Sequence, residues 1–272
     1  MVALPRSLLV LSLAAWGCLP ADPPDFTRDA GIVRKPARTG AKGTPEPGKI
    51  LRAADTGPRK VSRPADAGPV LAQGPVLSEP FRDDFDRAEL GADWNATSAA
   101  WRLEDGRLCG KGARNHPVWL KKRLPVNARI EFDATSGSPD GDIKVEAWGD
   151  GRSFATGTTY DDATSYLFIL GGWKNRFSVL ARLNEHAQNR QEVRLLPGSE
   201  DPRTQQVVEG KSYHVEIERS DGQTVSFTVD ETPIHEFSDP APLKGAGHEH
   251  FAFNDWEVPV CFDAFQVTPL EG

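Results

Sequence analysis

The stretch Lys211-Ser-Tyr-His-Val-Glu-Ile-Glu-Arg219, followed by Ser220-Asp-Gly222 and Thr224-Val-Ser-Phe-Thr-Val229, decides the fold class of this 272-residue chain. Apolar and polar residues alternate in both runs, which is the period of a strand with one buried face. The Asp-Gly pair between the runs is typical of a tight turn. We therefore predict an antiparallel hairpin over residues 211–229.

The same strand-like character continues through the chain from residue 81 onward. Further short runs occupy residues 129–134, 143–148, 177–182 and 258–267. Residues 165–170 are almost continuously apolar, which is typical of a strand buried on both faces, and Gly171-Gly172 ends this run with a turn. About a dozen short strands, few helical windows and no internal repeat favour an all-β fold, either a two-sheet antiparallel sandwich or a barrel.

The composition is different before residue 80. Residues 19–79 contain 10 Pro, 7 Gly and 9 Ala in 61 positions, with Phe26 as their single aromatic residue. A segment so poor in large apolar side chains cannot bury enough surface to fold, so we predict a disordered linker over residues 19–79. Residues 80–272 are long enough for one hydrophobic core and form the predicted domain.

Charge is divided unevenly along the chain. Residues 19–79 carry 10 basic and 7 acidic residues, whereas residues 80–272 carry 21 basic and 32 acidic residues, a net charge of −11. A domain with this charge repels phosphate backbones, which argues against nucleic acid as its partner. The sequence also has no apolar run of the ~20 residues that a membrane-spanning helix needs.

The first 18 residues, MVALPRSLLVLSLAAWGC, have the features of an export signal. Arg6 supplies a positive charge, and residues 7–16 form an apolar segment that is too short to span a bilayer. Ala15-Trp16-Gly17-Cys18 resembles the lipobox of bacterial lipoproteins, which implies a signal peptide over residues 1–18, export, and a lipid anchor on Cys18. By resemblance to the sorting rule of enterobacterial lipoproteins, Leu19 favours the outer membrane, with the membrane face left open. The alternative is an ordinary secretory signal with an incidental Cys18.

Motifs at both ends of the domain resemble one fold family. Phe81-Arg-Asp-Asp-Phe-Asp-Arg87, Leu90-Gly-Ala-Asp-Trp94 and Trp101-Arg-Leu-Glu-Asp-Gly-Arg-Leu108 are similar to the opening of concanavalin A-like lectin/glucanase domains. Val260-Cys-Phe-Asp-Ala-Phe-Gln-Val267 is similar to their last strand. The resemblance implies a jelly roll of two curved antiparallel sheets. It further implies that the first and last strands lie side by side and that a ligand binds in the concave groove.

The resemblance also bears on the cysteines and on metal binding. If Cys18 carries a lipid, Cys109 and Cys261 remain, and two cysteines of an exported protein can pair. The resemblance implies that Cys261, on the last strand, lies near the early strands that carry Cys109, which favours a disulfide. Domains of this fold often hold a structural Ca²⁺ near their joined termini, and Asp84 and Asp263 are the candidate ligands. No other cofactor is predicted.

Aromatic side chains beside turns are the first ligand-binding candidates, because aromatic faces stack on the C–H groups of sugar rings. The candidates in or next to turn and loop sequences are Trp148, Tyr160, Trp173 and Trp256. The alternative for each of them is burial under a loop. Trp94 and Trp101 match core positions of the family that this domain resembles, so they are expected to pack in the core.

A charged run directly follows the strand predicted at 177–182. It contains Arg182, Glu185, His186 and Arg190, which are predicted to converge on one ligand. Arginine forks suit carboxylates and sulfates, so an acidic sugar is one expectation. The alternative is a solvated loop with local ion pairs.

Paired carboxylates are the signature of a glycosidase, which in its retaining form needs two carboxyl groups ~5–5.5 Å apart. In the glucanase branch of the family that this domain resembles, the catalytic carboxyl groups lie on one strand in the pattern Glu-x-Asp-x-(x)-Glu. Glu131-Phe-Asp133 lacks the second Glu, so glucanase-type catalysis is not expected. Glu146, Glu185 and His186 remain as candidates for a non-standard acid/base pair.

Three functions are compatible with these observations. The first is a surface-tethered carbohydrate-binding or adhesion module of the bacterial envelope. The second is a glycoside hydrolase-like enzyme with a non-standard acid/base pair, and the third is a structural, protein-interaction module without a sugar site. A groove with exposed Trp, Arg, Glu and His side chains favours the first two, whereas a groove filled with apolar side chains favours the third.

Overall fold

The centre of the molecule is a strand whose residues alternate between buried and half-buried along its whole length. In β6 (Ala128–Ser136), Ala128, Ile130, Phe132 and Ala134 are buried, and the residues between them are half-buried. The predicted hairpin is present next to it, because β11 (Ser212–Arg219) pairs antiparallel with both β6 and β12 (Thr224–Val229). The Asp221 carboxylate accepts hydrogen bonds from the backbone N–H groups of Gln223 and Thr224 and so closes the turn.

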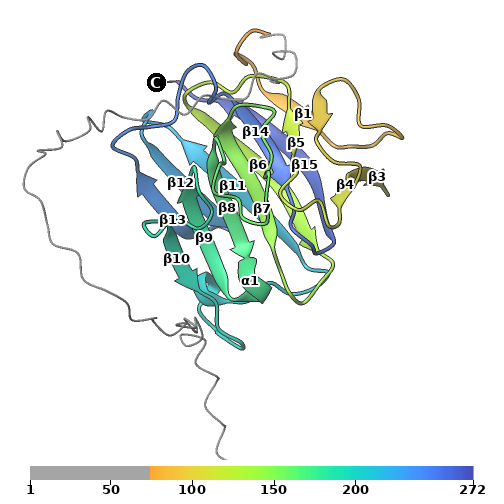
Figure 1. Cartoon of the computed structure of the whole chain (residues 1–272), viewed down its shortest axis with the longest axis vertical. Helices are drawn as coiled ribbons and strands as arrows, with labels where there is room; N and C mark the ends of the chain where they lie inside the picture. Colours follow the sequence, from red (N-terminus) through yellow and green to blue (C-terminus); the bar gives the residue numbers. More distant parts are fainter. Residues whose placement is uncertain (1–73, 272) are drawn as a thin grey trace, which may run out of the picture. The chain divides into compact units, whose positions relative to one another are not determined.

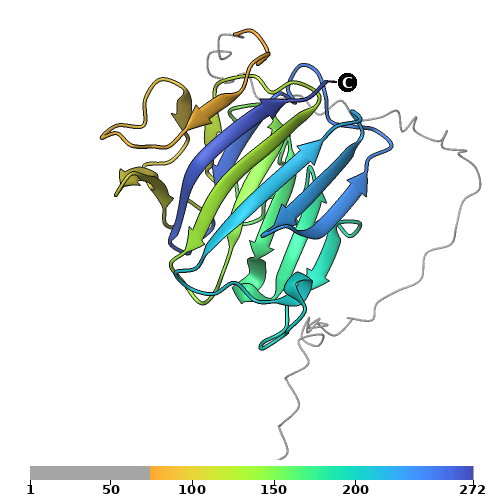
Figure 2. The same cartoon turned by 180° about the vertical axis from the view of Figure 1, so that it is seen from behind.

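The computed structural model describes residues 74–271, and these residues form two antiparallel sheets, one behind the other (Figure 1). The eight-stranded sheet, seen from its own side in Figure 2, has the order β13 (Thr232–Ser238), β12, β11, β6, β15 (Val260–Pro269), β4 (Arg107–Gly110) and β3 (Arg102–Glu104), with β1 (Phe81–Asp83) also paired to β15. The seven-stranded sheet has the order β10 (Gln191–Arg194), β9 (Phe177–Arg182), β8 (Tyr166–Gly171), β7 (Ile143–Gly149), β14 (His250–Asn254), β5 (Val118–Leu120) and β2 (Trp94–Ala96). The short helical segments within residues 74–271 are α1 (Gly172–Asn175) and the 3₁₀ turn η1 (Pro202–Thr204).

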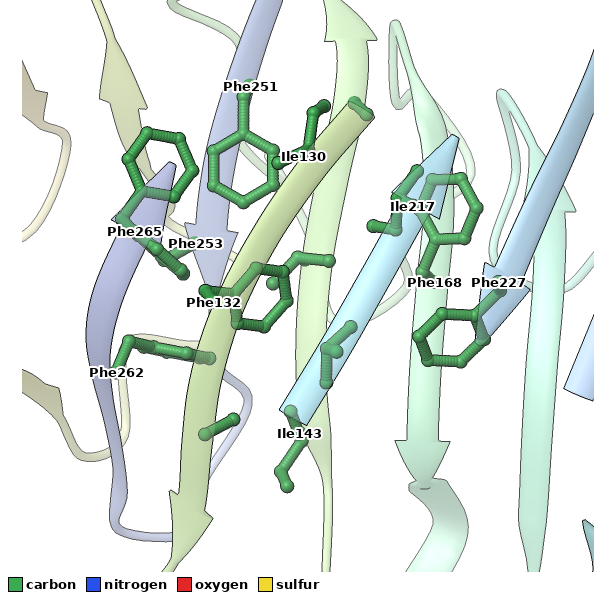
Figure 3. Close-up of a cluster of buried hydrophobic side chains, with 14 of the residues drawn as sticks. Ile130, Phe132, Ile143, Phe168, Ile217, Phe227, Phe251, Phe253, Phe262 and Phe265 are labelled. Atoms are coloured by element: carbon green, nitrogen blue, oxygen red, sulfur yellow. The ribbon is translucent and has the colours of Figure 1, made fainter. Parts of the chain in front are cut away.

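The predicted all-β, two-sheet sandwich is therefore confirmed, and its core lies between the sheets. Figure 3 shows the aromatic centre of this core, where Phe132 of β6, Phe253 of β14 and Phe262 of β15 meet. The ring centroids of Phe253 and Phe262 are 4.3 Å apart, and those of Phe132 and Phe253 are 5.4 Å apart. Because Phe253 belongs to one sheet and Phe132 and Phe262 belong to the other, these contacts hold the sheets together. Trp94 and Trp101 are buried in the same core, as expected.

The two ends of the domain meet in one sheet, as the family resemblance implies. Phe81 of β1 lies opposite Val267 of β15 in an antiparallel pair. On the other side of β15, Cys109 of β4 lies opposite Cys261, and the two cysteines form a disulfide with 4.1 Å between their Cα atoms. The register of the last strand thus brings together two cysteines that are 152 residues apart.

The segment before β1 also touches the domain. Val76 forms a β-bridge with Arg123, and the Leu77 N–H donates a hydrogen bond to the Arg123 carbonyl at 2.9 Å. Contact with the domain thus begins before the boundary predicted at residue 80. The predicted signal peptide, Cys18 and residues 19–73 lie outside the described residues. Within residues 74–271, no helix has both the length and the apolar character needed to cross a membrane.

The seven-stranded sheet also has a buried outer face. Along β8, Tyr166, Phe168 and Leu170 point into the main core, while Leu167 and Ile169 belong to a second apolar cluster. Because neighbouring residues of a strand face opposite sides, this second cluster lies on the outer face of the sheet. Residues 150–165, which connect β7 to β8, cover it with Ala155, Tyr160 and Ala163. Part of the outer face is therefore apolar and closed.

Candidate functional site

A pocket of about 600 Å³ lies at the outer face of the seven-stranded sheet, where the closed part ends. We call it the Lys144 pocket, after the buried lysine of β7 that lines it. Besides Lys144 of β7 itself, six connections contribute to it: β4–β5, β6–β7, β7–β8, β8–β9, β9–β10 and β14–β15. It is lined by Asn115, Ser138, Asp140, Asp142, Lys144, Thr158, Trp173, Lys174, Glu185, His186 and residues 256–259.

The inner wall of the pocket is built around an ion pair. Lys144 follows Ile143, which faces the main core, so Lys144 faces outward on β7. Its ammonium group donates hydrogen bonds to Glu185 Oε1 at 3.0 Å and to Asn115 Oδ1 at 2.9 Å. Lys144 is 1% exposed and Glu185 is 7% exposed, so both charges are withdrawn from water. A buried pair of this kind is costly to desolvate, and the hydrogen bonds offset that cost.

Buried carboxyl groups outnumber the one ammonium group near Lys144. Asp142 and Asp255 are buried beside the Lys144–Glu185 pair, and Lys144 also acts on the buried Glu146, which makes four carboxyl groups and one ammonium group. Burial raises the pKa of Asp142, and it raises the pKa of Asp255 to about 6 against the hydrogen bond from the Ala113 N–H. For Lys144, burial acts to lower the pKa, but Glu185 and Asp142 outweigh it and the pKa is raised. Lys144 is thus held in its charged form by the neighbouring carboxyl groups.

Two of these carboxylates have an oxygen atom that makes no hydrogen bond. Glu185 Oε2 and Asp255 Oδ1 are both buried and have no partner within residues 74–271. Leaving a buried charged oxygen unpaired costs about 1–3 kcal/mol or more, so each such atom calls for an explanation. Glu185 lines the pocket with other parts of the residue, while its Oε2 atom is closed off.

Two half-buried indoles lie at the edge of the pocket. Trp173 belongs to the turn between β8 and β9, and Trp256 follows β14. The Arg190 guanidinium lies 4.4 Å from the centre of the Trp173 ring and also donates a hydrogen bond to the Glu185 carbonyl at 2.6 Å. His186 packs edge to face against Trp173, with 5.9 Å between the rings. Arg190 and His186 thereby fix the orientation of Trp173.

The turn that carries Trp173 has a strained backbone. Trp173, Lys174 and Asn175 all have φ between 52° and 60°, in the left-handed region that residues with a Cβ atom seldom adopt. The buried Asn175 side chain holds this turn, since it donates hydrogen bonds to the carbonyls of Pro139 and Val207 and accepts one from the Val207 N–H. Sequence patterns predicted only a Gly-Gly turn at this place. Strain maintained by the surrounding structure is found most often at functional sites.

Glu146 is adjacent to this site but closed off from it. Its carboxylate accepts hydrogen bonds from the Ser165 hydroxyl at 2.6 Å, the Asn254 side-chain amide at 2.7 Å and the Tyr160 hydroxyl at 3.1 Å. Burial raises the pKa of Glu146 to about 7, although these hydrogen bonds and Lys144 lower it. Glu146 and Tyr160 are both fully buried. The predictions of a catalytic role for Glu146 and of a ligand-binding role for Tyr160 are therefore wrong. The two residues fasten the covering loop to the sheet instead.

Trp148 does not reach the pocket, although a sequence turn signal follows it. The pairing of β7 with β14 shifts register between His250 and Phe251, so Trp148 is an extra residue that turns into the main core. It is fully buried, its indole N–H donates a hydrogen bond to the Pro125 carbonyl, and the Arg219 guanidinium lies 4.0 Å from the ring centre. The predicted ligand-binding role of Trp148 is therefore wrong.

Arg182 is also directed away from the pocket. Its guanidinium donates hydrogen bonds to the Asp239 carboxylate at 2.8 Å and to the Ala241 carbonyl at 2.9 Å. The predicted convergence of four charged side chains thus reduces to Glu185 and His186 in the pocket lining, with Arg190 behind Trp173. Since both arginines have other partners, the acidic-sugar expectation loses its basis.

The predicted calcium ligands do not form a cluster. Within residues 74–271, no group of three or more His, Cys, Asp or Glu side chains is placed to hold a metal ion. Asp84 accepts a hydrogen bond from the Asp86 N–H, and Asp263 accepts one from the Ala264 N–H. A second hollow of about 700 Å³ lies near Asp84, but its buried carboxylate, Asp83, is already bound by Arg87 and Trp94.

Sequence reasoning missed Asn115, Asp142 and Lys144. Asp142 belongs to an Asp-Gly-Asp stretch, which is typical of a turn, and Lys144 alternates with core residues of β7, which predicts a solvated position. The sequence feature that could have indicated burial on this side of β7 is the loop of residues 150–165, because its Ala and Tyr residues cover part of this face of the sheet.

Comparison with solved structures finds other β-sandwich proteins. The chain is similar to the carbohydrate-binding module CBM66 from Bacillus subtilis, with a TM-score of 0.47 and 12% identity over 65% of this chain and 95% of that chain. It is similar to the Emp47p carbohydrate recognition domain, with a TM-score of 0.47 and 12% identity over 71% and 95%. A sialidase gives a TM-score of 0.49 and 17% identity over 74% of this chain and 19% of that chain. These likenesses concern the fold alone. No family model and no curated protein matches the chain.

Proposed function

We propose that this domain is a carbohydrate-binding module and that the sugar binds in the Lys144 pocket. The observation that carries the proposal is the pairing of two half-buried indoles, Trp173 and Trp256, with buried hydrogen-bonding groups in one pocket. Sugar rings present C–H faces that stack on aromatic rings and hydroxyl groups that need directed polar partners. The volume of about 600 Å³ lies within the range of small-molecule sites.

The test is a glycan array probed with the purified protein. We expect binding to a related set of glycans, and we expect Trp173→Ala and Trp256→Ala each to weaken it strongly. Phe154→Ala is the matched control, because Phe154 is an exposed aromatic residue that stacks on His116 outside the pocket. If no glycan binds, or if Phe154→Ala weakens binding as much as the two tryptophan variants, the proposed site is wrong.

Glycan cleavage is the second candidate function, and one observation favours it. Asp142 and Glu185 are two buried carboxylates that line the same pocket, with His186 beside them. A carboxylate pair is the usual machinery for glycoside hydrolysis. Incubation of the protein with each bound glycan, followed by chromatography of the products, distinguishes the functions. New reducing ends that disappear with Glu185→Gln favour the enzyme, and intact glycans favour the binding module.

We further propose that the domain is tethered to a bacterial membrane through a lipid on Cys18. The lipobox-like Ala15-Trp16-Gly17-Cys18 and the Pro-rich residues that follow support this proposal. Several acyl chains on one residue anchor a protein firmly, at ~0.8 kcal/mol per buried CH₂ group. Expression of Cys18→Ser in bacteria should move the protein from the membrane fraction to the soluble fraction. Full retention in the membrane would contradict the anchor.

A further inference from the structure

Two buried side chains of the Lys144 pocket have polar atoms that remain open to a ligand. Asn115 is 3% exposed and Asp142 is 9% exposed, and both line the pocket. The Asn115 Nδ2 atom and the Asp142 carboxyl oxygens make no hydrogen bond within residues 74–271, and none of these atoms is closed off from solvent. Glu185 Oε2 differs from them, because it is closed off. Asn115 and Asp142 therefore offer buried polar atoms that a bound molecule can reach.

The contact with Lys144 determines which end of the Asn115 amide is left for the pocket. An ammonium group only donates hydrogen bonds, so the amide atom 2.9 Å from Lys144 Nζ has to be the oxygen. The amide nitrogen keeps its two N–H donors without an acceptor among the residues that the structure describes. The backbone of Asn115 is fixed as well, since its N–H donates to the Asp255 carbonyl at 2.8 Å and its carbonyl accepts from the Ala155 N–H at 2.9 Å. The pocket thus presents a hydrogen-bond donor in a fixed place.

Asp142 supplies an acceptor beside the same ammonium group. Like Glu185, it raises the pKa of Lys144 against the effect of burial, so the Asp142 carboxyl group lies close to Lys144. Its backbone is fixed, because its N–H donates a hydrogen bond to the Gly171 carbonyl at 2.9 Å. An ionised carboxyl group accepts hydrogen bonds from hydroxyl groups, and a protonated one both donates and accepts. Asp142 can therefore bind a hydroxyl group in either protonation state.

The charged groups of the inner wall already have partners. The buried Lys144 ammonium is bound to Asn115 and Glu185, so it does not offer a free cation to an acidic sugar. Glu185 is neutralised by the same ion pair and its Oε2 atom is closed off, so it does not offer a free anion to an amino sugar. Burial raises the pKa of Asp142, which weakens its attraction for a cation. Solvent screens three exposed side chains of both signs around the opening, Asp140, Lys174 and Glu257.

We propose that the Lys144 pocket selects a neutral sugar, whose ring hydroxyl groups accept a hydrogen bond from Asn115 Nδ2 and donate one to the Asp142 carboxyl group. The inference rests on the proposed function and narrows it to uncharged sugars held by these two contacts. A hydroxyl group both donates and accepts, so it satisfies the open amide and the open carboxyl group without bringing a charge into the pocket. Lys144 is a positioning residue, because it holds the Asn115 amide by its oxygen.

The first test is an array that carries neutral, acidic and free-amine glycans of matched backbones, probed with the purified protein. We expect the strongest binders to be neutral. A carboxylate, sulfate or ammonium group on the bound ring should lower the affinity by about tenfold or more, because a buried charge without a partner is costly. Strongest binding to acidic or free-amine glycans would overturn the neutral-sugar inference while the proposed function stands. Binding to no glycan would overturn both.

The second test uses calorimetry on the neutral glycan that binds best and on its monodeoxy derivatives, each of which lacks one hydroxyl group. Asp142→Gly removes the carboxyl group at a φ of 65°, which glycine readily adopts, and should weaken binding of the parent glycan about tenfold. The derivative without the hydroxyl that faces Asp142 should bind the variant and the wild type equally well. Asp105→Gly is the matched control, because Asp105 has φ 52° and is exposed between β3 and β4 of the other sheet.

Asn115→Gly, at a φ of 59°, extends the test to the amide. It should also weaken the parent glycan, and the derivative that becomes insensitive should be the one without the hydroxyl that faces Asn115. A purely structural effect of either substitution would weaken the parent and every derivative to the same extent, and that outcome would overturn the direct contacts. An equal loss with Asp105→Gly would do the same. Thermal unfolding of each variant shows that it is folded.

Discussion

Lys144 and Glu185 form a buried ion pair, with 3.0 Å between Nζ and Oε1, although they are 41 residues apart in the chain. Their side chains are 2% and 9% exposed. Lys144 comes from the middle of the seven-stranded sheet, and Glu185 comes from the loop after β9 that folds back over its outer face. The pair thus links the sheet to a loop and forms the inner wall of the pocket.

The first prediction concerns this pair. Lys144→Met leaves Glu185, Asp142 and Asp255 buried without a cation, and removal of one partner of a buried pair typically costs about 3–5 kcal/mol. Chemical denaturation should therefore show a free energy of unfolding lower by about that amount. Lys211→Met is the matched control, because Lys211 pairs with Asp230 at the surface and should cost less than about 1 kcal/mol. Similar losses for the two variants would contradict the assignment of a buried charge.

The second prediction concerns Gly141, the residue before Asp142. Its φ is +72°, and a Cβ atom there would lie 2.6 Å from the Gly171 carbonyl oxygen. Gly141→Ala should therefore destabilise the domain by about 1–3 kcal/mol more than the backbone strain alone and displace Asp142 from the pocket. Gly112→Ala reports the backbone strain alone, since Gly112 has φ +70° and open space around its Cβ position. Denaturation midpoints of both variants measure the difference, and equal midpoints would show that Gly141 has room.

The third prediction concerns the dependence of stability on pH. Glu146 has a pKa of about 7 in the folded protein and 4.5 as the ordinary value. As pH rises from 4.5 to 7, the unfolded chain loses this proton while the folded protein keeps it, so stability falls by at most about 3 kcal/mol. Asp255, with a pKa of about 6, acts in the same direction over part of this range.

The decisive measurement for Glu146 is the difference between the wild type and Glu146→Gln. His235, whose pKa is lowered to about 4 by burial, makes stability fall as pH decreases from 6.5 toward 4, so a single curve mixes opposing effects. In the variant, the contribution of Glu146 is absent and that of His235 remains. The stability of Glu146→Gln relative to the wild type should thus rise between pH 4.5 and 7. Parallel curves would refute the raised pKa of Glu146.

The fourth prediction concerns the disulfide between Cys109 and Cys261. It closes a loop of 152 residues, and loss of such a bond typically costs about 2–5 kcal/mol. Replacing both cysteines by serine should lower the unfolding free energy by this amount. The bond itself is tested by thiol counting in a Cys18→Ser background, where the denatured, unreduced protein should have no reactive thiol. Two reactive thiols would show that the bond is absent.

The candidate site was only partly predictable from the sequence. Trp173, Trp256, Glu185 and His186 were identified because turn signals or a charged run mark them, and all four line one pocket. Turn signals are local, so they show that a residue follows a strand but not which way its side chain points. Trp148 illustrates this limit, because a one-residue shift against β14 turns it into the core.

The sequence by itself determined the strands, and the family resemblance implied that the two ends of the domain lie side by side. An alternation of period two depends only on the local geometry of an extended chain, so strands at residues 129–134 and 211–229 could be assigned without knowledge of their neighbours. Only the tertiary structure decided that the outward-facing Lys144 and Glu146 are buried. Glu146 is closed off by Tyr160 and Ser165 of the loop after β7, and Lys144 is closed off by Asn115 and Glu185 from other parts of the chain. The pocket and its buried Lys144–Glu185 ion pair follow from contacts between distant parts of the chain, which no local pattern encodes.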